Sequence, residues 1–472
     1  MASSKGRKKL SVSEIARNTA HFQRWAHHHH HSAASMDDLP PDMLKQVERI
    51  FNTRGRLPYA VIDKTSDYHS ALKLLSPDLL VFLEAAYSQD PGLFSSNSEP
   101  ASHIYHDLTL VYEAWAQEML MGSSNVIWSE ADRANSVYSL IRKAGIRKNR
   151  LRHQCRLGLP KSRSSDKAKG ADVLAARVAI PDAVLYLPRT QLEELWKNRD
   201  SPYNVLATHN SAIPFNHNST PAAKAPQRQS FEFASSVWED KKADHAGVED
   251  AYRQNQMSTT ALARHLRAFK VPAPVIGLVW AEGSVQAHVD WVERKSEKVS
   301  VFSARYSPPR ADNRRISGAS AASSSPDFAW NLKKEADILS VFLLVRNIDE
   351  WTSTKFRDLI IRKVTKFAQH VQEGKVEFAV WKTRPKGRWS NVSSIAVDDD
   401  DVAAEASDDD HADSPPSSPK RSNRKSVRKS IPAKVGTRKK IVTKSPPEEN
   451  THKRDASASA PLPSQRVLRA RK

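Results

Sequence analysis

The chain has 472 residues, of which 39% are hydrophobic, and 73 Lys and Arg against 53 Asp and Glu give it a formal net charge of +20. This hydrophobic content is low for a chain that folds along its whole length, so we expect part of it to be disordered. No apolar run is long enough to span a membrane, no secretory signal is evident, and the single cysteine, Cys155, excludes a disulfide framework and a cysteine-based zinc module.

Several enzyme classes are excluded by their missing motifs. The sequence contains no glycine-rich loop of the dinucleotide-binding or P-loop type, and no His-Arg-Asp or Asp-Phe-Gly run of a protein kinase.

The positive charge is not confined to the C-terminal end. Residues 413–472 hold 17 Lys and Arg against four Asp and Glu, and residues 398–412 hold eight acids, so a charge of +15 remains on residues 1–397. A basic surface of this size favours polyanions through counterion release. The charge therefore predicts nucleic acid as a partner.

Residues 1–35 are basic and rich in Ser and Ala, and they contain five consecutive histidines, His27 to His31. This composition predicts a disordered segment that buries no core. The histidine run would suit a transition metal or an engineered tag, but low-complexity sequence is the favoured interpretation.

Residues 36–122 predict a helical lobe. Apolar residues recur there at spacings of three and four, and Ser76 followed by Pro77 is typical of a helix start. In the next segment Ser129 is expected to cap a helix with Glu130 in its first turn.

Residues 123–390 predict an α/β (α+β) domain, in which a mixed sheet is flanked by helices. Strands are expected within 176–187, 229–242, 273–293 (a hairpin around Glu282-Gly283) and 298–306, and helices over 247–269, 335–351 and 353–373. Segments near 160–170, 200–230 and 307–327 are expected to be exposed loop inserts.

Residues 391–472 predict a disordered tail, acidic first and then basic. Its basic clusters suit a nuclear import receptor, so we expect a nuclear protein. The residues that would carry this signal are Lys420, Arg421, Arg424, Lys425, Arg428, Lys429, Arg438, Lys439 and Lys440.

One arrangement of residues indicates chemistry. Asp182 follows Pro181 inside an apolar strand, and Glu239-Asp240-Lys241 ends the next expected strand. Because side chains alternate along a strand, Glu239 and Lys241 face one side and Asp240 the other. If Asp182 lies on the neighbouring strand, two carboxylates and an ammonium converge, a set that suits Mg²⁺ or Mn²⁺ and an activated water.

This order of elements resembles the PD-(D/E)xK nuclease-like superfamily, and the runs "WSEAD", "IPDAV", "AYRQNQMSTTALARHLRAF" and "VIGLVWAEGSVQAHVDW" are similar to uncharacterised fungal proteins with such a domain. The resemblance covers roughly residues 125–385. It implies that Asp182 and Glu239 bind the metal, Lys241 activates the water, Glu130 is an auxiliary acid and Gln254 assists. The implied function is Mg²⁺-dependent hydrolysis of phosphodiester bonds in nucleic acid.

Two alternatives stay open. A catalytically inactive domain of the same fold would bind DNA, chromatin or a protein partner through its basic segments. A rival metal site would use Asp290 and Glu293 with Lys295.

The most basic stretch of the folded part, residues 142–156, is the predicted phosphate-binding segment, because it lies between the helix with Glu130 and the strand with Asp182. Its candidate residues are Arg142, Lys143, Arg147, Lys148, Arg150, Arg152 and Arg156.

Overall fold

The computed structural model describes residues 10–97, 103–124, 126, 128–161, 172–210, 212–227, 229–241, 245–295, 298–308 and 328–382. These residues belong to one compact unit that runs from Met1 to Asn391. The predicted tail with its nuclear import residues, and most of the expected inserts near 160–170 and 307–327, lie outside the described residues.

A mixed sheet forms the centre of the unit, with the strand order β1-β11-β10-β9-β8-β7-β4 and with β12 paired to β10. Two neighbouring pairs, β1 with β11 and β8 with β9, are parallel, and the other pairs are antiparallel. The strands are β1 (His31–Ala33), β4 (Arg150–His153), β7 (Ala183–Tyr186), β8 (Ala234–Lys241), β9 (Val275–Ala281), β10 (Ser284–Lys295), β11 (Lys298–Arg305) and β12 (Trp330–Asn331). Two small sheets pair β2 (Leu57–Pro58) with β3 (Phe94–Ser95) and β5 (Leu157–Gly158) with β6 (Val178–Ala179).

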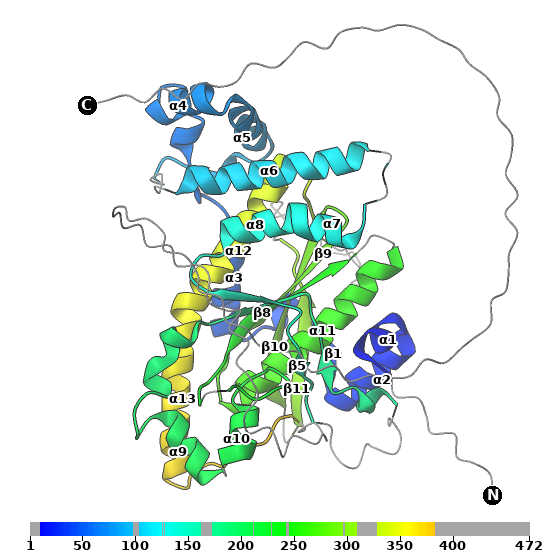
Figure 1. Cartoon of the computed structure of the whole chain (residues 1–472), viewed down its shortest axis with the longest axis vertical. Coiled ribbons are helices and arrows are strands. Elements are labelled where there is room, and N and C mark those ends of the chain that lie inside the picture. The colour runs from blue at the N-terminus through cyan, green and yellow to red at the C-terminus, as the bar shows by residue number, and fades with distance from the viewer. Residues whose placement is uncertain are drawn as a thin grey trace, which may run out of the picture. The chain divides into compact units, whose positions relative to one another are not determined.

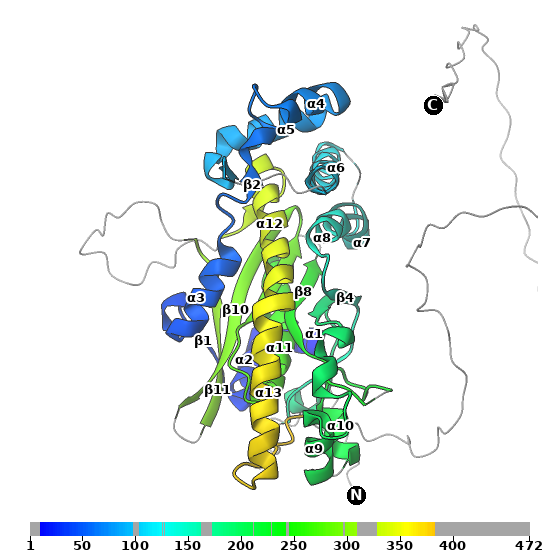
Figure 2. The same cartoon turned by 90° about the vertical axis from the view of Figure 1, so that its left-hand side faces the viewer.

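Helices cover both sides of this sheet: α11 lies with α1 and α2 on one side, and α12 and α13 lie on the other (Figures 1 and 2). The α-helices are α1 (Val12–Arg17), α2 (Thr19–His29), α3 (Pro41–Phe51), α4 (Asp67–Leu75), α5 (Pro77–Gln89), α6 (Ile104–Ser123), α7 (Glu130–Arg133), α8 (Ser139–Gly145), α9 (Pro202–His209), α10 (Ala212–Asn218), α11 (His245–Ala268), α12 (Glu335–Trp351) and α13 (Arg357–Gln372). π-Helical turns at Ala134–Tyr138 and Thr352–Phe356 join α7 to α8 and α12 to α13.

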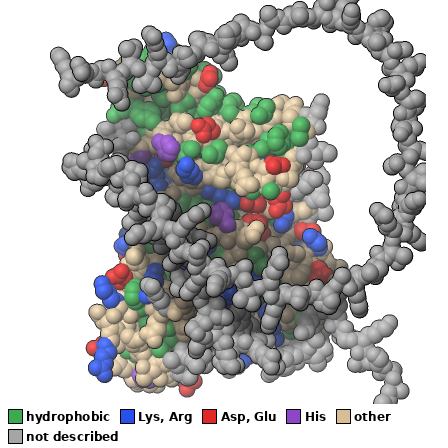
Figure 3. Space-filling model, viewed as in Figure 1, with side chains coloured by type: hydrophobic (Ala, Val, Ile, Leu, Met, Phe, Trp, Pro, Cys, Tyr) green, Lys and Arg blue, Asp and Glu red, His purple; other side chains and the backbone are tan. Residues whose placement is uncertain are grey.

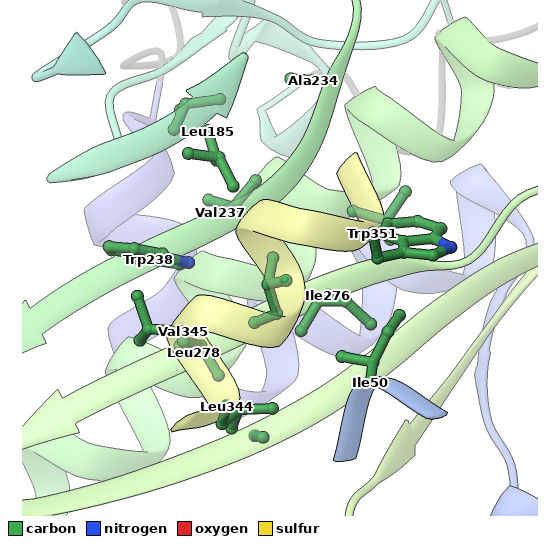
Figure 4. Packing of buried hydrophobic residues seen from close by; sticks show 14 of the residues in the cluster. Ile50, Leu185, Ala234, Val237, Trp238, Ile276, Leu278, Leu344, Val345 and Trp351 are labelled. Atoms are coloured by element: carbon green, nitrogen blue, oxygen red, sulfur yellow. The ribbon is translucent and has the colours of Figure 1, made fainter. Parts of the chain in front are cut away.

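The core lies between the sheet and α12. Strands β8 and β9 are almost entirely buried, which explains why β9 reads as a continuous apolar run. Trp238 and Leu278 on these strands pack near Leu344 and Val345 of α12 (Figure 4). Each such buried side chain contributes roughly 1.5–3 kcal/mol.

The predicted fold class, a mixed sheet flanked by helices, is confirmed. The helices expected over 247–269 and 335–351 form as α11 and α12, and the hairpin turns at Glu282-Gly283, where both residues have positive φ. Among the described helices, none combines the length and the apolar composition needed to cross a membrane.

The expectation that residues 1–35 bury no core is wrong from residue 10 onward. Ser11 and Asn18 cap the short helices α1 and α2, and Trp25 is almost completely buried. The segment is too short to form a core alone, but its apolar residues are buried against the rest of the unit, because it packs on α11 and adds β1 to the edge of the sheet. The histidine run is part of this structure, since His29 ends α2 and His31 begins β1.

The segment 200–230 is also not the exposed loop that was expected. It contains α9 and α10, and Tyr203, Leu206 and Phe215 are buried. The aromatic rings of Tyr203 and Phe215 pack edge to face with Phe231. These few large apolar residues stabilise the segment in spite of its Ser, Pro and Asn content.

The predicted helical lobe, residues 36–122, is helical but shares the core of the rest of the unit. Its outer surface is apolar in places: hydrophobic side chains gather over α4, α5 and α6 at the top of Figure 3, and Leu74, Leu75 and Val81 are exposed.

Candidate functional site

Strands β7 and β8 bring Asp182 and Glu239 together. Ala183 pairs with Trp238 in the antiparallel register, so the preceding Asp182 lies opposite the following Glu239, and opposite residues share a face of the sheet. The Asp182 Oδ2 atom accepts a hydrogen bond of 2.8 Å from the backbone N–H of Asp240. Glu239 is fully buried and Asp182 partly so.

Lys241 ends β8 on the same face as Glu239, since the two residues are two positions apart in a strand. Its side chain is partly buried, and its positive charge acts on both carboxyl groups. The structure therefore brings together the two carboxylates and the ammonium that the sequence pattern singled out.

Gln254 of α11 completes the group. Its Nε2 donates to Glu239 Oε2 over 3.0 Å, and its Oε1 accepts a hydrogen bond of 3.3 Å from the Ser13 hydroxyl of α1. Glu239 Oε1 meets no N–H or hydroxyl donor within the described part of the chain. One oxygen of Glu239 is thus oriented by an amide, and the carboxyl group also lies within hydrogen-bonding reach of Asp182.

Burial is the main cause that raises the pKa of Glu239 well above its ordinary value, and the nearby Asp182 raises it further. Burial also raises the pKa of Asp182, although the Asp240 amide and the Lys241 charge act in the opposite direction. Without a cation, the two carboxyl groups therefore favour sharing one proton over carrying two charges.

The donor set fits a hard divalent cation with few protein ligands. Mg²⁺ commonly binds through one or two carboxylates together with water and substrate oxygens, and Asp182 with the orphaned Oε1 of Glu239 offers such a pair. Among the residues that the structure describes, no group of three or more His, Cys, Asp or Glu side chains is placed to hold a metal ion.

Glu130 is not among the charged groups that shift the pKa values of Asp182 and Glu239. It is the first residue of α7, and the main charged neighbours of Asp182 and Glu239 are each other, Asp240 and Lys241. The same helix is held by Arg133, which pairs with Glu118 at 3.4 Å.

Arg142 was predicted to bind phosphate, and this prediction is wrong. Its guanidinium is buried and forms a two-point ion pair with Asp240, with Nη1 to Oδ2 at 3.0 Å. It also lies over the rings of Trp238 and Trp280, at 5.2 and 4.8 Å from their centroids. Sequence reasoning placed Asp240 away from the site but missed that a buried carboxylate on that face needs a cation.

The other residues of the basic stretch divide into two groups. Arg147 pairs with Asp107, and Arg152 pairs with Glu232 at 2.7 Å and stacks over Tyr186. The remaining candidates are exposed: Lys143 lies on α8, and Lys148, Arg150 and Arg156 lie at or near β4, the strand at the edge of the sheet beside β7.

The rival site does not form. Asp290 is buried and accepts a hydrogen bond of 2.8 Å from His288 Nδ1, and it also accepts one from Thr259. Glu293 is three residues further along β10, so it faces the other side of the strand, where it accepts from Trp291 Nε1. The side chain of Lys295 lies outside the described residues.

No model of a known protein family and no curated protein matches this chain.

Proposed function

We propose that the protein is a metal-dependent, nuclease-like hydrolase of phosphodiester bonds in nucleic acid, and that Asp182 and Glu239 hold a Mg²⁺ or Mn²⁺ ion. One observation carries this proposal: Asp182, Glu239 and Gln254 come from three different elements and meet at one point, with Lys241 beside them. Their order along the chain is the one expected for the PD-(D/E)xK superfamily, and it supports the same function.

The chain's own residues would divide the work as follows. A divalent ion, when bound, stabilises charge that develops at phosphorus and acidifies a bound water. Gln254 fixes the orientation of the Glu239 carboxylate through the bond to Oε2, which leaves Oε1 for the ion. Lys241 on the same face is a donor that can hold the attacking water or a phosphate oxygen.

Cleavage assays test this proposal. Labelled DNA and RNA, single- and double-stranded, are incubated with the full chain and Mg²⁺ or Mn²⁺, beside Lys241→Ala and the exposed control Lys64→Ala. We expect Lys241→Ala to slow cleavage by about 10²–10⁴-fold, because it removes the donor beside the reacting groups, and Lys64→Ala to have no effect. Equal cleavage by Lys241→Ala and the unchanged protein, or no cleavage by either, contradicts the enzyme.

The complete burial of Glu239 favours one alternative, an inactive domain of the same fold that binds DNA, chromatin or a protein partner. In that case a proton shared by Asp182 and Glu239, together with the hydrogen bond from Gln254, stabilises the two buried carboxyl groups without a cation. The alternative predicts binding of nucleic acid in EDTA and no cleavage when Mg²⁺ or Mn²⁺ is added. Nuclear import through the basic tail remains a prediction in either case.

A further inference from the structure

Helix α13 has one apolar and one basic face. Its apolar face is buried and is made of Ile360, Val364, Phe367, Ala368 and Val371. On the outer face, Arg362 and Lys366 are exposed one turn apart, about 6 Å along the axis, and Lys363 lies beside them. Lys355 is exposed in the π-helical turn that leads into the helix. We call Lys355, Arg362, Lys363 and Lys366 the basic stripe.

The charge of the basic stripe is not neutralised within the described part of the chain. The acids next to it are paired with other cations: Asp358 with Arg357 at 2.8 Å, and Glu373 with Lys375 at 2.8 Å. None of the four stripe residues has an ion pair among the described residues. This differs from the predicted phosphate-binding stretch, where Arg142, Arg147 and Arg152 are each paired with an acid.

Two of the elements that pack along α13 are helix α9, which contains no acidic residue, and the 3₁₀ helix Arg189–Leu195, which carries Glu193 and Glu194. Glu193 is paired with Lys197 at 3.0 Å. Four cations without an ion pair, three on α13 and one in the turn before it, provide a surface for an extended polyanion, and duplex nucleic acid carries one negative charge per ~1.7 Å of its axis.

We propose that the basic stripe of α13 binds the phosphate backbone of duplex nucleic acid. Figures 1 and 2 place α13 and α11 on opposite sides of the sheet, and Gln254, which contacts Glu239, belongs to α11. The stripe therefore anchors the duplex and does not position the bond to be cleaved. The choice of nucleic acid as the ligand rests on the proposed function; the existence of an anion-binding surface does not.

Salt-dependent binding tests the stripe. The full chain and the variant Lys355→Gln/Arg362→Gln/Lys363→Gln/Lys366→Gln are titrated with a fluorescent DNA duplex in EDTA, between 50 and 200 mM salt. The slope of log affinity against log salt falls by about 0.9 for each lost phosphate contact, hence by about 3–4. Over this range the unchanged protein should lose on the order of 10²-fold more affinity than the variant.

A matched control separates the stripe from net charge. Lys45→Gln/Arg49→Gln/Lys64→Gln/Lys73→Gln removes the same four charges from exposed positions of the N-terminal helical region. An equal change of slope in both variants, or no change in the stripe variant, overturns the proposal. The proposal is also overturned if the stripe variant loses affinity for poly-glutamate but keeps its affinity for duplex DNA, because the stripe would then bind an acidic protein.

Both variants should keep the unfolding temperature of the unchanged protein, since all eight residues lie outside the buried core. The assay contains no divalent cation and reads binding alone. A negative result in this binding assay therefore contradicts the basic stripe alone, and a negative result in the cleavage assay contradicts the proposed nuclease activity alone.

Discussion

At the scale of single residues, Arg142 and Asp240 form a buried ion pair that joins α8 to strand β8. Both side chains are buried, and the pair sits between the two layers under Trp238 and Trp280. Removal of either partner leaves an uncompensated charge in the interior, which costs far more than the pair itself contributes.

We expect Arg142→Ala to lower the free energy of unfolding by about 3–5 kcal/mol, because Asp240 would remain buried without its cation. The neighbouring Lys143 is exposed, so Lys143→Ala should change the free energy of unfolding by no more than about 0.5 kcal/mol. Urea titration followed by circular dichroism measures both values. Equal stability of the two variants would show that Asp240 finds another partner.

Part of the candidate site could be predicted from residues alone. Strand alternation was enough to place Glu239 and Lys241 together and Asp240 opposite, because the period of two is fixed by backbone geometry. The pairing of Asp182 with Glu239 needed a register that no local pattern encodes. The contact of Ser13 with Gln254 joins residues 241 positions apart, and nothing in either sequence neighbourhood indicates it.

At the scale of elements, α1, α2 and β1 act as a strap across α11. Arg253 Nε donates to the Ala16 carbonyl over 2.6 Å, and Arg264 Nη2 donates to the His29 carbonyl over 2.6 Å. Composition misled here, because the segment takes its stability from α11 and β11 and has little of its own.

The strap should be sensitive to acid. The pKa of His29 is lowered to about 3 and that of His31 to about 4; burial is the largest cause for both, and the neighbouring Arg264 acts in the same direction. His28 and His30 also lower the pKa of His29, while around His31 the Asp290 charge raises the pKa and His288 lowers it.

A histidine whose folded pKa is depressed contributes stability above its unfolded pKa of 6.5, and this contribution is lost as the pH falls from 6.5 toward 4. At pH 5 each histidine should therefore cost about 2 kcal/mol relative to pH 8. We expect amide hydrogen exchange in residues 10–35 to accelerate over this interval, after correction for the intrinsic pH dependence.

In the double variant His29→Gln/His31→Gln, the corrected exchange rate of residues 10–35 should no longer depend on pH. In the exposed control His27→Gln, the rate should rise with falling pH as it does in the unchanged protein. An identical pH profile in all three proteins would assign the effect to other groups.

At the scale of the whole molecule, the boundary expected near residue 122 is not a boundary between folding units. Asn347 of α12 donates to the backbone carbonyls of Ile50 and Asn52, at 2.9 and 3.0 Å, and Arg147 pairs with Asp107 of α6. Apolar spacing revealed the helices before residue 122, but helical periodicity does not show which neighbour covers an apolar face.

Residues 123–382 expressed alone should not unfold cooperatively, because α12 would expose the apolar positions that α3, α5 and α6 cover. Thermal unfolding followed by near-UV circular dichroism checks this against the full chain. A sharp transition in the fragment would restore the boundary that the sequence predicted.

The parallel pairing of β1 with β11 also sets an order of events during biosynthesis. His31 pairs with Val301, so the strand made first waits for 270 further residues before its partner exists. At ~5–20 residues per second, translation of that stretch takes roughly 15–55 s. For that time β1 has no partner strand, and we expect a nascent chain in this state to be a substrate for ribosome-associated chaperones.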